Sequence, residues 1–396
     1  MLEQKLRKAK KVKKLKISEI RRFFAAARLY PDAINLGIGE PDFTSPKNVI
    51  KASEKAMEEG KTHYTPTNGI PELLEAIAEK TRRDYNLNYN PETEILVTVG
   101  AVEAVFLALM ATINPGDEVL IPDPGFVVYQ PIVELAEGVP VSIPLKEENG
   151  FKFNANTVRS LITDRSRVLL LNSPHNPTGS VLSYEDLSSI AKLAVEHDLI
   201  VISDEVYEKI TYDGVRHYCV ASFPGMRERT VVVNSFSKTY AMTGFRIGFA
   251  VGPEDIISAM ILIHQYAVTC VNGPTQYAAL EALTGPQDFV VEMVREFDRR
   301  RRLVCKRINE IEGLSCITPK GAFYVFPNIK AFGMSSKDFA QFLLKEARVV
   351  TVPGSGFGKY GEGYLRLSYA TSYEQLEEAM NRIEKAVKKL KKLGSF

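Results

Sequence analysis

A lysine that follows a predicted buried strand is the residue best placed to do chemistry in this sequence. Residues 230–233 (TVVV) form a β-branched run of strand length, and Ser235, Ser237 and then Lys238 come soon after it. Burial at such a position lowers the pKa of a lysine from about 10.4 toward the range in which the neutral amine is a nucleophile. Arg246 follows a few residues later. Two hydroxyls and a guanidinium around one lysine indicate a phosphate cradle beside an imine-forming amine. Solvated residues on a loop are the alternative.

A second strand brings a carboxylate to the same region. Residues 199–203 (LIVIS) predict a buried strand that ends at Asp204, and Val206 and Tyr207 follow. Pyridoxal 5′-phosphate (PLP) needs a buried carboxylate that keeps its pyridine nitrogen protonated. Asp204 can supply that carboxylate, while Tyr207 can reach the ring hydroxyl and Val206 can pack on one face of the ring.

Two further strand ends carry groups that suit the same cofactor. The strand predicted at 168–171 leads into a proline-rich turn, in which Asn176 can donate to the ring oxygen. The strand predicted at 95–99 leads into a glycine and then a helix, and such a helix start presents backbone N–H groups to a phosphate. The residues concerned are Gly100, Ala101 and Val102. Each motif alone is weak, but four strand ends with complementary groups predict one PLP site.

These residues must be positioned by an alternation of strands and helices. Strands are predicted at 95–99, 118–121, 139–143, 168–171, 199–203, 230–233 and 247–251, and helices at 46–59, 69–86, 101–112, 126–136 and 183–196. Such an alternation predicts a mostly parallel sheet with helices on both faces. Ligands bind these sheets outside the carboxyl ends of the strands, where all four groups lie.

The chain as a whole resembles the class I PLP-dependent aminotransferases of fold type I, in the prokaryotic aspartate/aromatic aminotransferase branch. The resemblance runs from about residue 17 to about residue 390 and rests on six motifs: NLGIGEPDF (35–43), THYTPTNGIPELLEAIA (62–78), NSPHNPTG (172–179), SDEVY (203–207), SFSKTYAMTGFRIG (235–248) and YLRLSYA (364–370). It implies an α/β fold, with a mostly parallel seven-stranded sheet flanked by helices in a large domain and a smaller α+β domain. We expect an N-terminal arm and small-domain segment (1–46), a large PLP-binding domain (47–285) and a C-terminal small domain (286–396).

The resemblance also implies roles for residues outside the strand ends. Gly39 is expected to let a substrate carboxylate approach the backbone, and Phe126 to stack on the PLP face opposite Val206. Tyr64 is expected to reach the phosphate of the other subunit's cofactor, which implies a homodimer with shared active sites. The alternatives are a core aromatic for Phe126 and a buried loop tyrosine for Tyr64. Arg366 stands in an alternating apolar strand, where its charge indicates an anion partner, here the substrate α-carboxylate with help from Asn176.

The implied activity is transamination between an L-amino acid and a 2-oxo acid such as 2-oxoglutarate, with ping-pong kinetics through an imine of Lys238. Aspartate-specific relatives often carry a lysine where this chain has Val102, so the sequence favours aromatic or large hydrophobic donors. Aspartate aminotransferase is the alternative within the family. A PLP-dependent C–S β-lyase and a non-catalytic PLP-binding regulator are the alternatives from other classes.

The composition is that of an ordinary soluble globular protein. The 396 residues are 45% hydrophobic and 25% charged with a formal net charge of +2, which gives no general reason to expect a nucleic-acid or membrane partner. The four cysteines lack CxxC spacing and the five histidines lack metal-ligand spacing, so neither a metal nor a disulfide is indicated. With no signal peptide or membrane-spanning run, we expect a cytoplasmic enzyme. The basic segment 1–16 is predicted to be a solvated arm packed on a neighbouring subunit, with a nucleic-acid or membrane tether as the alternative, and the arginine run 299–302 a solvated helix face.

Overall fold

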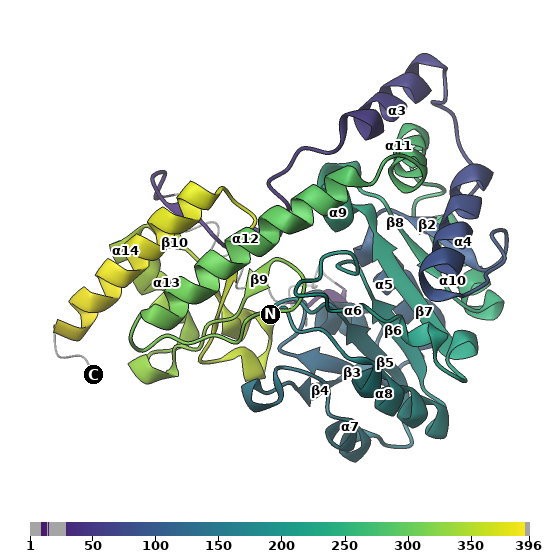
Figure 1. Cartoon of the computed structure of the whole chain (residues 1–396). Helices are drawn as coiled ribbons and strands as arrows, with labels where there is room; N and C mark the ends of the chain where they lie inside the picture. The colour runs from purple at the N-terminus through teal and green to yellow at the C-terminus, as the bar shows by residue number, and fades with distance from the viewer. Residues whose placement is uncertain (1–8, 14, 16–28, 393–396) are drawn as a thin grey trace, which may run out of the picture.

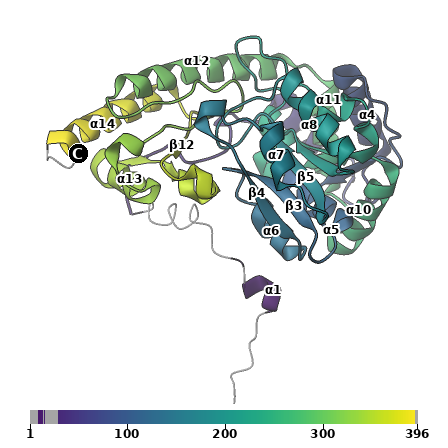
Figure 2. The same ribbon diagram turned by 90° about the horizontal axis from the view of Figure 1, so that it is seen from below.

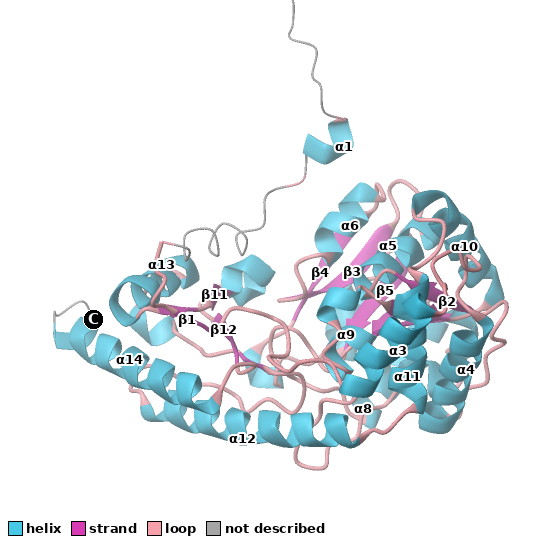
Figure 3. Cartoon of the chain, turned by 90° about the horizontal axis from the view of Figure 1, so that it is seen from above, coloured by secondary structure: helices cyan, strands magenta, loops and turns pink. Residues whose placement is uncertain are grey.

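The computed structural model describes residues 9–13, 15 and 29–392. Most of the predicted basic arm therefore lies outside the described residues. Its described part contains a short helix, α1 (Lys10–Lys13). Two lobes make up the molecule, and the long helix α12 (Asp288–Glu310) runs along both of them (Figures 1 and 3). No helix in the described ranges is both long enough and apolar enough to cross a membrane.

A seven-stranded sheet is the centre of the larger lobe. Its spatial order is β2-β8-β7-β6-β5-β3-β4, and β8 alone runs antiparallel to its neighbours. The strands are β2 (Ile95–Thr98), β3 (Glu118–Asp123), β4 (Val139–Pro144), β5 (Ser166–Asn172), β6 (Ile200–Asp204), β7 (Thr230–Ser235) and β8 (Gly248–Val251). The prediction of a mostly parallel sheet of seven strands is confirmed.

Helices cover both faces of this sheet because its strands carry apolar side chains on both faces. On β5, Val168 and Leu170 join the core beneath α5 (Ala101–Thr112), α6 (Tyr129–Leu135) and α10 (Glu254–Ala267). Leu169 and Leu171 point the other way. That opposite face carries α4 (Pro71–Tyr85), α7 (Ala155–Leu161), α8 (Tyr184–Glu196) and α11 (Gly273–Thr284), with α3 (Lys47–Glu58) packed on α11. Figure 2 shows the sheet between these layers.

The predicted helix at 126–136 begins later than expected. Pro124 and Gly125 hold the chain in a turn after β3, and α6 starts only at Tyr129. Phe126 therefore lies on a loop at the sheet edge and not on the helix. The consequence is local: the ring of Phe126 meets Tyr129 edge to face, at 5.7 Å between centroids.

The smaller lobe combines short strands with three helices around one apolar core. Its strands are β1 (Ile34–Asn35), which pairs with β10 (Val349–Val350), and the antiparallel set β9 (Tyr324–Val325), β11 (Val352–Pro353) and β12 (Leu365–Ser368). Its helices are α12, α13 (Ser336–Phe342) and α14 (Tyr373–Lys392). The pairing of β1 with β10 places a segment from the start of the chain beside one from its end. The exact domain boundaries stay a prediction.

Candidate active site

A cavity of about 480 Å³ opens at the carboxyl ends of β5, β6 and β7. The parallel register puts Asn172 beside Asp204 and Asp204 beside Val233, so the three strands end together. Thirteen of the fifteen residues predicted for the site line the cavity: Gly39, Ala101, Val102, Phe126, Asn176, Asp204, Val206, Tyr207, Ser235, Ser237, Lys238, Arg246 and Arg366. Gly100 lies next to it, and Tyr64 lies elsewhere. The structure thus brings the predicted groups together, while their roles stay predictions.

Lys238 lies on α9 (Phe236–Thr239), the single turn of helix that follows β7. Ser235 caps this turn, because its Oγ accepts a hydrogen bond from the backbone N–H of Ser237 at 3.1 Å. The Nζ of Lys238 donates to the carbonyl oxygen of Gly39 at 2.6 Å. Loss of water around the ammonium lowers the pKa of Lys238 to about 8, and the positive charge of Arg366 acts in the same direction. The amine is thus much closer to neutrality than a solvated lysine.

Asp204 is the last residue of β6 and is 4% exposed. Burial raises the pKa of its carboxyl to about 6, although a 2.6 Å hydrogen bond donated by the Tyr129 hydroxyl opposes the rise. No cationic side chain among the described residues forms an ion pair with it. A buried carboxylate without a cation is costly on its own, and a pyridinium nitrogen in the cavity would supply the missing charge.

Groups that can bind an anion border the cavity near the start of α5. Gly100 has φ of 85° and precedes α5, and a Cβ there would lie 2.6 Å from Nη2 of Arg246. Arg246 donates to backbone carbonyls, at 3.0 Å to Thr243 and 3.4 Å to Val99. The hydroxyls of Ser235 and Ser237 border the same part of the cavity. A helix N-terminus, a guanidinium and two hydroxyls suit a phosphate group.

A second guanidinium, which unlike that of Arg246 is buried, completes the cavity. Arg366, on β12, donates from Nη1 to Oδ1 of Asn176 at 3.1 Å and from Nη2 to the carbonyl of Gly37 at 2.6 Å, while its Nε has no partner. The rings of Tyr324 and Phe357 flank it, with centroids 4.5 and 4.9 Å from its central carbon. Burial lowers its pKa. The arrangement leaves Arg366 with aromatic and neutral partners, ready for a carboxylate.

Three residues that shape this site are absent from the sequence-based prediction. Tyr129 binds the carboxylate of Asp204, Tyr324 shares a 2.8 Å hydrogen bond between hydroxyls with Tyr207, and Phe357 flanks Arg366. A Cβ on Gly39 would lie 2.7 Å from the Tyr324 hydroxyl, so the glycine also makes room for this ring. Tyr129 follows Phe126 by three positions, and this proximity in sequence is the one local signal that could have found it.

Tyr64 does not contribute to the cavity of its own chain. Its side chain is 88% exposed on the loop between α3 and α4, so the alternative of a buried loop tyrosine is wrong. Val102, by contrast, is 41% exposed and borders the cavity from the first turn of α5.

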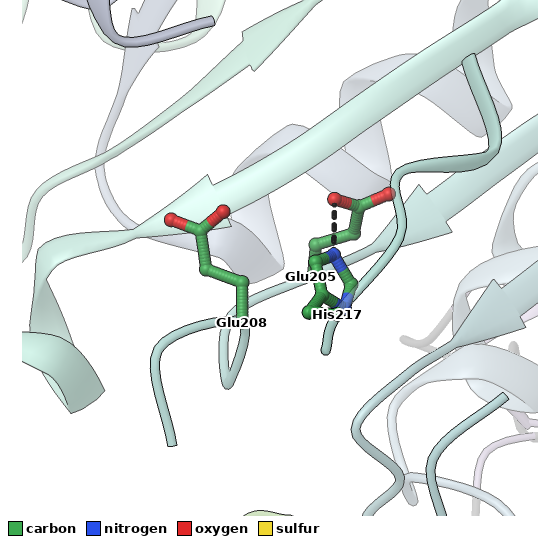
Figure 4. Close-up of side chains that lie close together, drawn as sticks. All are labelled: Glu205, Glu208 and His217. Atoms are coloured by element: carbon green, nitrogen blue, oxygen red, sulfur yellow. Dashed lines mark hydrogen bonds and ion pairs between the residues drawn. The ribbon is translucent and has the colours of Figure 1, made fainter. Parts of the chain in front are cut away.

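A second cluster of ionisable groups lies just behind the site. Glu205, Glu208 and His217 come close together although the histidines showed no metal-ligand spacing along the chain (Figure 4). The ring nitrogen Nε2 of His217 lies 2.9 Å from Oε2 of Glu205, and Nζ of Lys80 lies 2.5 Å from Oε1 of Glu208. Lys80 also reaches Asp84 at 3.2 Å. Because an ammonium already compensates Glu208, we interpret the cluster as an ion-paired network that anchors the segment after β6.

Comparison with known proteins places the chain in a class of enzymes. The family model described as aminotransferase class I and II matches residues 31–383, and the chain belongs to this family. It is 52% identical over 376 residues to an aspartate aminotransferase of Pyrococcus abyssi, covering 94% of this chain and 96% of that one. It is 49% identical to aromatic-amino-acid aminotransferase 2 of Thermococcus litoralis, with the same coverage.

A solved structure agrees with these relatives. The crystal structure of an aromatic aminotransferase from Pyrococcus horikoshii superposes with a TM-score of 0.90 at 51% identity, covering 93% of this chain and 99% of that one. The predicted family, fold and enzyme class are confirmed: this protein is an aminotransferase, and its family implies PLP as the cofactor.

Proposed function

We propose that this enzyme uses PLP, bound through Lys238, to transfer the amino group of an aromatic or large hydrophobic L-amino acid to a 2-oxo acid such as 2-oxoglutarate. The observation that supports it is one cavity, bordered also by the exposed Glu40, in which a lysine of lowered pKa lies among three charged groups that have no ionic partner in the described residues: Asp204, Arg246 and Arg366. These charges match the pyridine nitrogen, the phosphate and the substrate carboxylate respectively.

The residues present fit the cofactor at each of its polar groups. Asp204 would hold the protonated ring nitrogen, and Tyr129 orients that carboxylate. Asn176 and Tyr207 line the cavity and would contact the ring hydroxyl. Phe126 and Val206 also line it and would pack against the two faces of the ring. Arg246, the two serines and the start of α5 would hold the phosphate, with Gly100 required because any Cβ would meet Arg246. When bound, PLP withdraws electrons from the bonds at the substrate Cα.

Lys238 has two tasks in this proposal. Its Nζ would hold the cofactor in the resting enzyme. Once an amino acid had displaced it, the free amine would take the proton from the substrate Cα and deliver it to the cofactor. A pKa near 8 suits both steps, because a general base works best close to the operating pH. The carbonyl of Gly39, 2.6 Å from Nζ, orients the amine.

Arg366 would bind the substrate α-carboxylate through a bidentate pair. Its Nε is buried and without a hydrogen-bond partner, and Asn176 holds one side of its fork. An arriving carboxylate satisfies this guanidinium and fixes Cα beside Lys238.

The donor preference rests on Val102. It lines the cavity from the first turn of α5, and Val105 from the same helix is a second apolar lining residue. A large hydrophobic side chain gains burial against this part of the wall, whereas a distal carboxylate would lose water without meeting a cation there. Aspartate as donor is the second candidate, since the Pyrococcus abyssi relative is named an aspartate aminotransferase.

A panel of amino donors with 2-oxoglutarate tests the proposal. We expect the keto acid and glutamate in equal amounts, with phenylalanine or tyrosine giving a higher kcat/KM than aspartate. Release of ammonia and pyruvate from cysteine conjugates, without keto acid from other donors, would instead support a β-lyase. The relatives described above are all named as aminotransferases, which favours the first outcome.

We further propose a homodimer in which Tyr64 reaches the phosphate in the partner's site; a cytoplasmic location stays a prediction from the sequence. The loop of Tyr64 lies beside the connection between α10 and α11, where Oγ1 of Thr65 lies 3.4 Å from the carbonyl of Val271. Exposed apolar side chains gather on the same stretch: Leu262, Tyr266 and Val268. Mixing inactive Lys238→Ala chains with impaired Tyr64→Phe chains should restore activity. Each hybrid dimer then has both defects in one site and an intact second site. No recovery in verified hybrids would show that Tyr64 serves its own subunit.

A further inference from the structure

Two cysteines far from the cavity meet in the smaller lobe. Cys305 lies in the second half of α12, and Cys316 lies on the returning chain just after the helix ends, where the two thiols hydrogen bond to each other. The side chain of Asn309 fixes this arrangement. Its Oδ1 accepts from the backbone N–H of Cys316 at 2.9 Å, and its Nδ2 donates to the carbonyl of Cys305 at 3.0 Å. Both cysteines are free thiols.

The surroundings favour the thiolate at Cys305 over a thiolate at Cys316, because the hydrogen bond to Cys305 and burial both raise the pKa of Cys316. The hydrogen bond from Cys316 lowers the pKa of Cys305, and the positive charge of Arg301, one helical turn earlier, acts in the same direction. Cys305 is buried, whereas Cys316 is partly exposed and also receives a contact from Nδ2 of Asn309 at 3.7 Å. One sulfur is therefore accessible to a reagent and the other is held next to it.

We propose that Cys305 and Cys316 form a redox-modification site, a dithiol that a low-molecular-weight disulfide converts into an intramolecular disulfide bond. The other two cysteines, Cys219 and Cys270, are not part of it. This inference goes beyond transamination and does not depend on the donor or on PLP.

The exchange balances without any further reactant. The Cys305 thiolate accepts the proton of Cys316 along their hydrogen bond, and the Cys316 thiolate attacks one sulfur of the reagent. A mixed disulfide forms, the bond between the two reagent sulfurs breaks, and the other sulfur leaves as a thiolate and takes up a proton. Cys305 then loses its proton and attacks Cys316, which forms the Cys305–Cys316 bond and releases the second thiol. The two cysteines lose two electrons and two protons, and the reagent disulfide gains them.

Oxidation should stabilise the smaller lobe without changing the chemistry of the cavity. The bond would close the turn between α12 and the segment at Ser315, which pairs with Asn328. Cys316 lies eight positions before Tyr324 on the way to the Arg366 site, so the active-site groups themselves are not altered. Restriction of a loop of this length predicts a rise in Tm of about 3 °C for a chain of this size.

The test exposes the PLP-loaded enzyme to oxidised glutathione, then alkylates it under denaturing conditions and maps its peptides. We expect two of the four thiols to be protected, a peptide pair linked through Cys305 and Cys316, and a rise in Tm that dithiothreitol reverses. A glutathione adduct on Cys316 without that link, or four reactive thiols after exposure, would overturn the proposal.

Variants make the result specific. Cys316→Ala should fold normally, because its side chain is only partly buried, and should show neither the link nor the rise in Tm. Cys305→Ala should behave alike but with a lower starting Tm, since it removes a buried sulfur. Cys270→Ala is the matched control and should keep both. A rise in Tm of the same size in Cys316→Ala would contradict the assignment.

Discussion

Charged side chains on the two sides of the segment that follows β6 differ in whether they have an ion-pair partner. Facing the cavity, Asp204 has no ion pair among the described residues, and burial raises its pKa to about 6. Facing away, Glu208 pairs with Lys80. Lys80 also pairs with Asp84. Burial alone would raise the pKa of Asp84, but the hydrogen bond from Arg83 and the charges of Lys80 and Lys209 hold this pKa well below its usual range.

The difference separates a structural network from a binding site. A buried ion pair is complete in the folded chain, and removal of one partner leaves an uncompensated charge. The cavity contains charges whose partners a ligand must supply, so the free protein gives up stability there and recovers it on binding. The same five-residue stretch serves both: Asp204 and Tyr207 face the cavity while Glu205 and Glu208 anchor it from behind.

Removal of Lys238 should have the largest effect. Lys238→Ala should reduce kcat by about 10⁴-fold or more, because it removes both the attachment of the cofactor and the proton transfer at Cα. Its stability should change little, since Lys238 has no ion pair among the described residues. Borohydride should fix PLP on Lys238 in the native enzyme, located by mass spectrometry. The exposed Lys192 on α8, changed to alanine, is the control and should keep full activity. An adduct on another lysine would refute the assignment.

The opposite pattern is expected for Lys80. Lys80→Met should lower the free energy of unfolding by about 3–5 kcal/mol, because it leaves Glu208 buried without its cation and removes one of the three cations around Asp84. Enzyme that remains folded should keep most of its kcat. Urea unfolding measures the loss, and Lys55→Met is the matched control. Lys55 pairs with Glu59 at 3.7 Å on the surface, so its removal should cost less than about 1 kcal/mol. Equal losses in the two variants would show that Lys80 is not structurally important.

Asp204 and Asp84 should respond to neutralisation with opposite signs. The folded-state pKa of Asp204 lies above its ordinary value of 3.8. Its buried charge therefore leaves the stability of the folded protein unchanged below pH 3.8 and lowers it by the full amount above pH 6. In the PLP-free protein, Asp204→Asn should therefore gain on the order of 2–3 kcal/mol of stability at pH 7 and nothing near pH 4. Asp84 has a lowered pKa, so Asp84→Asn should instead lose stability, by about 1–3 kcal/mol at pH 7.

Activity completes this contrast. Asp204→Asn should lose most turnover, about 10²-fold or more, because the ring nitrogen is no longer kept protonated, and PLP should stabilise it less than it stabilises the wild type. Asp84→Asn should remain active. Unfolding curves at pH 4 and pH 7, with and without PLP, measure the stability of each variant and its stabilisation by PLP. Steady-state kinetics measure the kcat of each variant. Near-normal turnover of Asp204→Asn would exclude the proposed role.

The sequence predicted the cavity better than its surroundings, for a physical reason. Parallel strands end at one edge of a sheet, so a residue type at a strand end, such as Asp204 or Lys238, implies its neighbours in space. Tyr324 and Phe357 contact Arg366 within the smaller lobe but from other segments of the chain, and no local pattern shows such contacts. The same limit explains the pairing of Cys305 with Cys316, which the spacing of the cysteines did not indicate.

Long-range pairing also corrects the prediction for the arginine run at 299–302. Arg301 is 1% exposed and not solvated, because Asp213 and Asp298 accept from its guanidinium and it packs over the ring of Tyr212. Arg300 is also buried and pairs with Asp42 at 2.7 Å. Arg299 and Arg302 remain on the surface, as expected. Arg302 shares Asp213 and Asp298 with Arg301 and is still exposed, so the side of α12 on which each arginine lies decides whether it is buried.

The smallest expected effect concerns the wall of the cavity. Burial of an aromatic ring against Val102 contributes roughly 1.5–3 kcal/mol, which is about one to two powers of ten in kcat/KM for phenylalanine over aspartate. Val102→Lys places a cation where a distal carboxylate would lie, so the ratio should move toward aspartate, while the matched control Val102→Met keeps the wall apolar and should keep the preference. Steady-state kinetics with both donors at fixed 2-oxoglutarate measure the ratio. If the wild type already prefers aspartate by about tenfold, a cation from outside the described wall binds the distal carboxylate. Val102 would then not select the donor, and the unpaired charges around Lys238 would still make the site an aminotransferase site.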